Sequence, residues 1–140
     1  MKPKVGLMLG GGGAKGGYQL GVIKALQDEK LLDNIDCIAG TSIGAINGLL
    51  ITALKDADKI HETWKLAQEK QKENKGFNRF KKDKLGLYSL NTLREMLEKT
   101  VSLKMINKSH IDLYVITAKI INEEIFGAQI WPNNFEKCVW

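Results

Sequence analysis

A short motif, Gly40-Thr41-Ser42-Ile43-Gly44, stands between an apolar run at residues 35–39 and a nearly all-apolar run at residues 43–54. The first run predicts a buried strand, and the second predicts a helix packed at the centre of the fold. A strand that turns directly into a helix brings the two elements so close that side chains larger than hydrogen would clash beside the turn. The motif therefore predicts a sharp strand-to-helix turn that presents Ser42.

A second glycine cluster, at residues 10–17, follows another short apolar run at residues 5–9. A helical pattern from residue 17 to about residue 30 separates this cluster from the strand at residues 35–39. The resulting βαβα order predicts an α/β fold, with a parallel sheet at its core, right-handed crossovers and flanking helices. Because loops after parallel strands meet at one sheet edge, we expect the two glycine segments to be neighbours.

The rest of the chain continues the alternation of helices and strands. Asp56 or Asp58 can cap a helix that extends to about residue 73, and Ser89 can cap another. Residues 111–121 predict a third strand, and the tail that follows is compatible with an added antiparallel strand. No repeat or linker divides the 140 residues, so we expect residues 1–140 to form one domain or part of one. The predicted apolar stripe of the first of these helices is Ile60, Trp64 and Ala67.

Composition narrows the classes of function. Two cysteines, Cys37 and Cys138, show no metal-ligand spacing and are too few for a disulfide framework. The apolar run at residues 43–54 is shorter than the roughly 20 residues that a membrane span needs, and no secretory signal opens the chain. These features lead us to expect a cytoplasmic protein, at most peripheral at a membrane.

The formal net charge of +5 is concentrated in one basic segment. A solvated loop is the simplest interpretation, and contact with an anionic membrane surface is the alternative. Nucleic-acid binding is not expected, since only Phe77 and Phe80 stand among these cations as stacking residues. The basic residues are Lys70, Lys72, Lys75, Arg79, Lys81, Lys82 and Lys84.

Together, the two glycine segments are typical of acyl transfer. A serine hydroxyl on a strand-to-helix turn is presented for attack on a carbonyl, provided that a base removes its proton. Glycines such as Gly11, Gly12 and Gly13 expose backbone N–H groups that can hold the developing oxyanion. The simpler alternative is that Thr41 or Ser42 only caps the helix.

The upstream cluster also satisfies Gly-x-Gly-x-x-Gly, so dinucleotide binding has to be considered. That fingerprint needs an acidic residue at the end of the second strand, whereas Asp36 stands at its beginning. A phosphate-binding P-loop does not fit either, because Lys15 is followed by Gly16 rather than by serine or threonine. Nucleotide binding is therefore the weaker hypothesis.

Three segments in order carry a resemblance to the patatin-like phospholipase family: Gly11-Gly12-Gly13-Ala14-Lys15-Gly16, then Gly21-Val22, then Gly40-Thr41-Ser42-Ile43-Gly44-Ala45-Ile46-Asn47. The resemblance implies a three-layer α/β/α domain that hydrolyses lipid esters, such as those of phospholipids, without a metal or organic cofactor. It implies Ser42 as the nucleophile and an oxyanion hole formed by Gly11, Gly12 and Gly13. The nucleophile elbow would be Gly40, Thr41, Ile43 and Gly44, and Lys15 and Gly16 would be candidates for positioning the loop.

One part of the family pattern is missing. Members use a serine–aspartate dyad whose aspartate lies in an Asp-Gly-Gly or Asp-Gly-Ala motif, and none of the seven aspartates here precedes a glycine. His110 and Asp112 are expected at the opposite edge of the sheet, and His61 on a solvated helix face. We therefore expect the amino-terminal portion of a longer domain, inactive by itself. The alternative is a non-catalytic module that binds a lipid or a partner on the same scaffold.

Overall fold

One four-stranded sheet, in the order β1-β2-β3-β4, organises the computed structural model, which describes residues 3–74, 91–121 and 124–131. Strands β1, β2 and β3 are parallel, and β4 runs antiparallel to β3. The parallel core and the antiparallel addition agree with the sequence prediction. The strands are β1 (Gly6–Leu9), β2 (Cys37–Thr41), β3 (Asp112–Ile121) and β4 (Glu124–Trp131).

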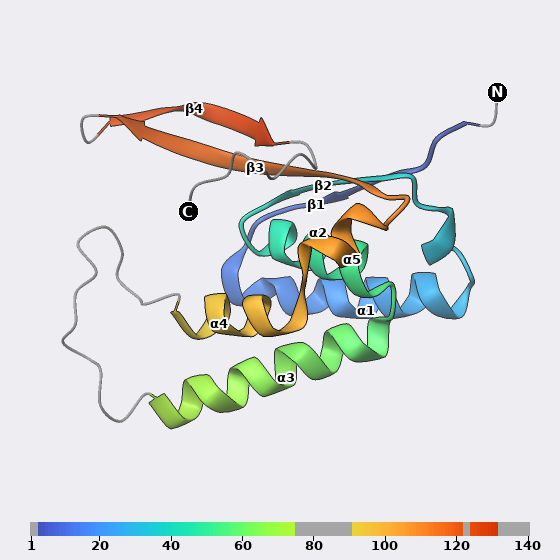
Figure 1. Ribbon diagram of the computed structural model, residues 1–140, viewed down its shortest axis with the longest axis horizontal. Helices are drawn as coiled ribbons and strands as arrows, with labels where there is room; N and C mark the ends of the chain where they lie inside the picture. Colours follow the sequence, from blue (N-terminus) through green and yellow to red (C-terminus); the bar gives the residue numbers. More distant parts are fainter. Residues whose placement is uncertain (1–2, 75–90, 122–123, 132–140) are drawn as a thin grey trace.

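The described helices lie on one side of this sheet, with α2 directly beneath it and α3 farthest away (Figure 1). They pack against the parallel strands, which confirms the predicted α/β class; of the three layers that the resemblance implied, the described residues form the sheet and one helical layer. The α-helices are α1 (Gly17–Asp28), α2 (Ile43–Leu54), α3 (Ala57–Asn74), α4 (Asn91–Thr100) and α5 (Leu103–Asn107). Two short 3-10 helices, η1 (Gly13–Gly16) and η2 (Leu32–Asn34), precede α1 and β2.

The core forms where α2 packs against one face of the sheet. Ile38 and Leu113 face each other in register and are fully buried, as are Leu50 and Ile51 of α2. The opposite face carries the neighbours Met8, Ala39 and Tyr114, and Met8 is 84% exposed. Helix α2 is thus the central helix that its nearly all-apolar sequence predicts.

One local prediction needs correction, and one short helix was missed. Strand β2 begins at Cys37 and ends at Thr41 rather than spanning residues 35–39, because the Ile35 N–H still donates to the Leu32 carbonyl of η2 and not to a neighbouring strand. Gly40 and Thr41 belong to the strand, since they pair with Val115 and Ile116 of β3. Helix α5 was not predicted; Ser102 caps it by accepting a hydrogen bond from the backbone N–H of Met105.

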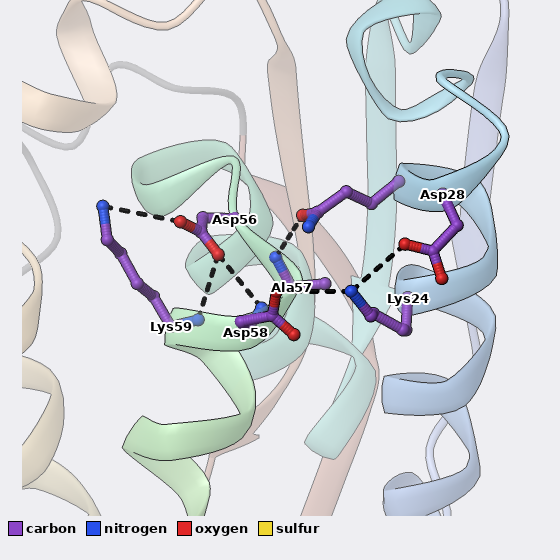
Figure 2. Close-up of polar contacts among 7 residues, drawn as sticks. Lys24, Asp28, Asp56, Ala57, Asp58 and Lys59 are labelled. Atoms are coloured by element: carbon purple, nitrogen blue, oxygen red, sulfur yellow. Dashed lines mark hydrogen bonds and ion pairs between the residues drawn. The ribbon is translucent and has the colours of Figure 1, made fainter.

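The junction of α1 and α3 is held by polar contacts (Figure 2). The Asp56 carboxylate accepts hydrogen bonds from the backbone N–H groups of Asp58 (3.0 Å) and Lys59 (3.1 Å), so Asp56, of the two predicted candidates, caps α3. The bond from the Lys59 backbone lowers the pKa of the Asp56 carboxyl. Lys24 of α1 lies 3.3 Å from the Asp58 carboxylate and 3.1 Å from that of Asp28.

Replacing Asp56 tests this cap. Asp56→Ala is expected to lower the free energy of unfolding by about 1 kcal/mol at pH 7, because two backbone N–H groups lose their acceptor. The lowered pKa means that the charged cap stabilises the fold above the ordinary carboxyl pKa of about 4, and that this contribution is lost as pH falls through and below it. Urea denaturation at pH 7 and pH 3.5 measures both effects.

Asp56→Asn is the matched control, because its amide oxygen keeps the acceptor but does not titrate. The stability gap between the original chain and Asp56→Asn should narrow at pH 3.5. A gap that is equal at both pH values would contradict the assignment of the pH effect to this carboxylate.

Candidate active site

Ser42 lies between β2 and α2 in a backbone conformation that non-glycine residues rarely adopt, with φ 52° and ψ −125°. Its side chain is exposed, and its carbonyl accepts the first hydrogen bonds of α2, from Ala45 and Ile46. No described residue forms a hydrogen bond with the Ser42 hydroxyl, which does not cap the helix. The predicted turn therefore exists, and its exposed hydroxyl has no hydrogen-bond partner in the described part of the chain.

The glycines on either side of Ser42 are required by close backbone contacts. A Cβ atom at Gly40 would lie 2.5 Å from the Gly44 carbonyl oxygen and 2.7 Å from the backbone nitrogen of Ala45. A Cβ atom at Gly44 would overlap the carbonyl group of Leu9 at the end of β1. The ends of β1 and β2 and the start of α2 therefore converge at this point, as the motif predicts.

The upstream glycine loop lies beside Ser42. A Cβ atom at Gly11 would stand 3.3 Å from the Cβ of Ser42 and 3.6 Å from the Cγ2 of Thr41. Gly12 and Gly13 are exposed and have φ values of +154° and +55°, which favour glycine. The structure thus places Gly11 beside the suggested nucleophile, Ser42, and Gly12 and Gly13 follow it in the same exposed loop.

The two loop-positioning candidates follow in η1. The backbone N–H of Lys15 donates to the Gly12 carbonyl (3.1 Å), which closes the loop, and the Lys15 side chain is exposed. Gly16 is buried against Ile43, with which a Cβ at position 16 would collide. Gly16 therefore fixes the distance between the glycine loop and the start of α2.

The histidines lie away from Ser42. The Nδ1 atom of His110 is 2.8 Å from the Nζ atom of Lys55, which follows the last residue of α2. Ser42 stands at the opposite end of this 12-residue helix, so about 18 Å of helix separates the two. Asp112 begins β3 at the same far edge, and His61 is exposed on α3. His110 is thus not placed to act as a base for Ser42, and neither histidine forms a hydrogen bond with Ser42.

A buried polar cluster beneath the glycine loop was not identified from the sequence. Gln19 of α1 and Asn47 of α2 are 2% and 1% exposed, and Trp64 of α3 reaches them with its indole nitrogen. In the sequence, only Asn47 pointed to this cluster, because it is an amide side chain within a nearly all-apolar helix. Its partners were not recognisable, because they are 28 and 17 residues away in the chain.

The family is decided by a match over most of the chain. Residues 7–138 match the family model of the patatin-like phospholipases. The chain belongs to the patatin-like phospholipase family. The predicted resemblance is thereby confirmed, together with the fold class that it implied.

Several relatives of this family member are lysophospholipases. The lysophospholipase nte1 of Aspergillus terreus is 57% identical over 56 residues, which is 40% of this chain and 3% of the relative. A patatin-like phospholipase domain-containing protein of Caenorhabditis elegans, ZK370.4, is 44% identical over 59 residues, or 42% of this chain and 4% of the relative. The chain thus spans only a few per cent of the length of these relatives. No solved structure matches it.

Two further properties of the described residues bear on binding. Within them, no helix combines the length and the apolar character needed to cross a bilayer. No group of three or more histidine, cysteine, aspartate or glutamate side chains in the same ranges is arranged to hold a metal ion. Most of the predicted basic segment, from residue 75 to residue 84, lies outside the described residues.

Proposed function

We propose that this chain carries the nucleophile and the oxyanion hole of a serine-dependent lipid acyl hydrolase. The substrate class is a carboxylic ester of a phospholipid or lysophospholipid, in keeping with the family and with the names of its relatives. The single observation that carries the proposal is the exposed Ser42 at φ 52°, with the glycine loop beside it. A residue that served only as a cap would not need this conformation, and Ser42 forms no side-chain cap.

The proposed reaction has two steps. The Ser42 Oγ attacks the ester carbonyl carbon while a base takes its proton, and backbone N–H groups of Gly11, Gly12 and Gly13 hold the oxyanion. The tetrahedral intermediate collapses by breaking the bond to the alcohol oxygen, which receives the proton, and an acyl-Ser42 ester remains. Water then hydrolyses that ester by the same route. The positive end of the α2 dipole favours the negative charge that develops at its start.

In this proposal, the 140 residues do not include the general base that takes the proton from Ser42. The chain holds no Asp-Gly motif, and no described carboxylate hydrogen-bonds to Ser42. We therefore propose that the aspartate is supplied by sequence outside these residues, that residues 1–140 form one portion of a single domain, and that the chain alone has negligible turnover. A transient contact with a membrane surface would deliver the substrate.

Labelling with a fluorophosphonate probe tests the proposal. In a polypeptide that extends the chain to an Asp-Gly motif, here called the extended polypeptide, we expect labelling at Ser42 and hydrolysis of a phospholipid. Ser42→Ala should lower both by about 10⁴-fold or more, because the bond-forming atom is gone. Ser102→Ala is the matched control: it removes another exposed serine, which caps α5 far along the chain.

Two outcomes would overturn parts of this proposal. Labelling that persists in Ser42→Ala, or binding of lipid vesicles without any labelling, would favour a non-catalytic module. Robust ester hydrolysis by the 140 residues alone, lost in Ser42→Ala, would show that the base is present within them.

A further inference from the structure

We propose that Gln19, Asn47 and Trp64 are positioning residues that orient the peptide group between Gly10 and Gly11 toward the substrate. The inference rests on the proposed function, because it assigns these residues to the oxyanion hole of that site. They act through the backbone of the glycine loop and do not touch the reacting atoms.

The three side chains form one continuous chain of hydrogen bonds. The indole Nε1–H of Trp64 donates to the Oδ1 of Asn47 (2.8 Å), and the Nδ2 of Asn47 donates to the Oε1 of Gln19 (2.7 Å). The Nε2 of Gln19 then donates to the Gly10 carbonyl oxygen (2.8 Å). Helices α3, α2 and α1 are thus linked in sequence to the loop that follows β1.

The direction of this chain is fixed by its two ends. An indole N–H can only donate, and a backbone carbonyl can only accept. Each amide between them must therefore accept on the side of Trp64 and donate on the side of Gly10, so neither Asn47 nor Gln19 can rotate its amide by 180° without losing its bonds. Because Asn47 and Gln19 are almost fully buried, bulk solvent does not reach an amide group that has lost its partner.

The Gly10 carbonyl, which is the last acceptor in this series of hydrogen bonds, sets the direction of the Gly11 N–H group. In a trans peptide the C=O and N–H bonds point in opposite directions, so the bond that holds the Gly10 carbonyl toward Gln19 turns the Gly11 N–H away from the helices. Gly11 is the loop residue that lies beside Ser42. The arrangement therefore fixes the Gly11 N–H as a donor for an oxyanion formed at Ser42.

Asn47 also holds the other end of the loop. Its Nδ2 lies 3.4 Å from the Gly16 carbonyl oxygen, and Asn47 is about one and a half turns of α2 beyond Ser42. Asn47 therefore belongs to the helix that presents Ser42 and contacts both ends of the glycine loop. It contacts Gly16 at the end of the loop directly, and Gly10 at its start through Gln19. A local change here should alter the distance and angle between nucleophile and donors, to which transition-state stabilisation is sensitive.

Two conservative variants of the extended polypeptide test the inference. Gln19→Met and Trp64→Phe keep most of the buried volume but remove a link of the chain. We expect kcat for ester hydrolysis and the rate of fluorophosphonate labelling to fall by about 10- to 100-fold, a part of what loss of an oxyanion-hole donor costs. KM should stay within about twofold, because ground-state binding is unaffected. The amide signal of Gly11 in the NMR spectrum should shift in both variants.

Thr52→Val and Thr63→Val are the matched controls. Each removes a buried hydroxyl that donates within its own helix, Thr52 to Gly48 in α2 and Thr63 to Lys59 in α3 (both 2.8 Å), without contact to the glycine loop. They should lower Tm to a similar degree as Trp64→Phe and leave kcat and the Gly11 signal unchanged. Their behaviour separates a loss of stability from a loss of orientation.

Two results would overturn the inference. One is a kcat and a labelling rate in Gln19→Met and Trp64→Phe equal to those of the threonine controls. The other is an unchanged Gly11 amide signal in Gln19→Met, a measurement that does not depend on catalysis. If Ser42→Ala behaved like the original polypeptide in labelling, the proposed function would fail, whereas the Gly11 signal would still decide whether the side chains orient the loop.

Discussion

Gly44→Ala is expected to lower Tm by roughly 15 °C, which corresponds to a loss of about 4 kcal/mol in the free energy of unfolding. The added methyl group would overlap the Leu9 carbonyl group, whose carbon would be 2.6 Å away, and the Gly10 oxygen, which would be 2.7 Å away. These are backbone atoms, so no side-chain rotation can make room, and α2 has to move off the sheet. Thermal unfolding followed by circular dichroism measures the loss.

Gly21→Ala is the control for this prediction. Gly21 is exposed within α1, and a Cβ atom there would meet nothing within 4 Å. Alanine at this helical position should therefore raise the free energy of unfolding, by up to about 1 kcal/mol. If Gly44→Ala and Gly21→Ala unfolded at the same temperature, the close approach of β1 and α2 would be wrong.

Gly12→Ala is expected to reduce fluorophosphonate labelling and ester hydrolysis of the extended polypeptide by about 10²- to 10³-fold. Gly12 has φ +154°, a conformation that alanine adopts only with strain of about 1–3 kcal/mol. The exposed loop can relax by rotating its peptide groups, which moves the proposed donor N–H groups away from the oxyanion. The core is not touched, so Tm should change much less than in Gly44→Ala.

Gly10→Ala separates strain from added bulk in the same loop. Gly10 has no positive φ, and a Cβ atom there would have nothing within 4 Å. Its carbonyl keeps the bond from Gln19, so labelling should remain within about threefold of the original rate. Labelling of Gly12→Ala at the rate of Gly10→Ala would argue against a role for the loop amides.

Elements with a strong and continuous pattern were predictable from the sequence. Helix α2 begins and ends at the predicted residues, because its apolar run starts directly after the glycine turn and stops at charged residues. The strand before it was displaced by two residues, since Gly40 and Thr41 have the composition of a turn and become strand residues through pairing with β3 and, at Gly40, also with β1. Sheet pairing depends on sequence that is remote from the strand itself.

The sequence predicted the turn and the glycine loop of the candidate site, but not the buried side chains that hydrogen-bond to the loop. Ser42 and the glycines lie in contiguous motifs, so their types and order indicated the turn and the loop. Gln19 and Trp64 lie within ordinary helical patterns, and Trp64 fits the apolar stripe of α3 as well as its hydrogen bond to Asn47. Packing of three helices creates this cluster, and no local pattern encodes it.

The positive φ at position 42 makes stability and the proposed catalysis favour different residues. Glycine there would relax the turn, stabilising the fold by about 1–3 kcal/mol, and would at the same time remove the side-chain oxygen that we propose to form the bond with the acyl group. Selection of variants for a higher melting temperature alone would therefore favour glycine at position 42, and the selected proteins would lack the proposed hydrolase activity.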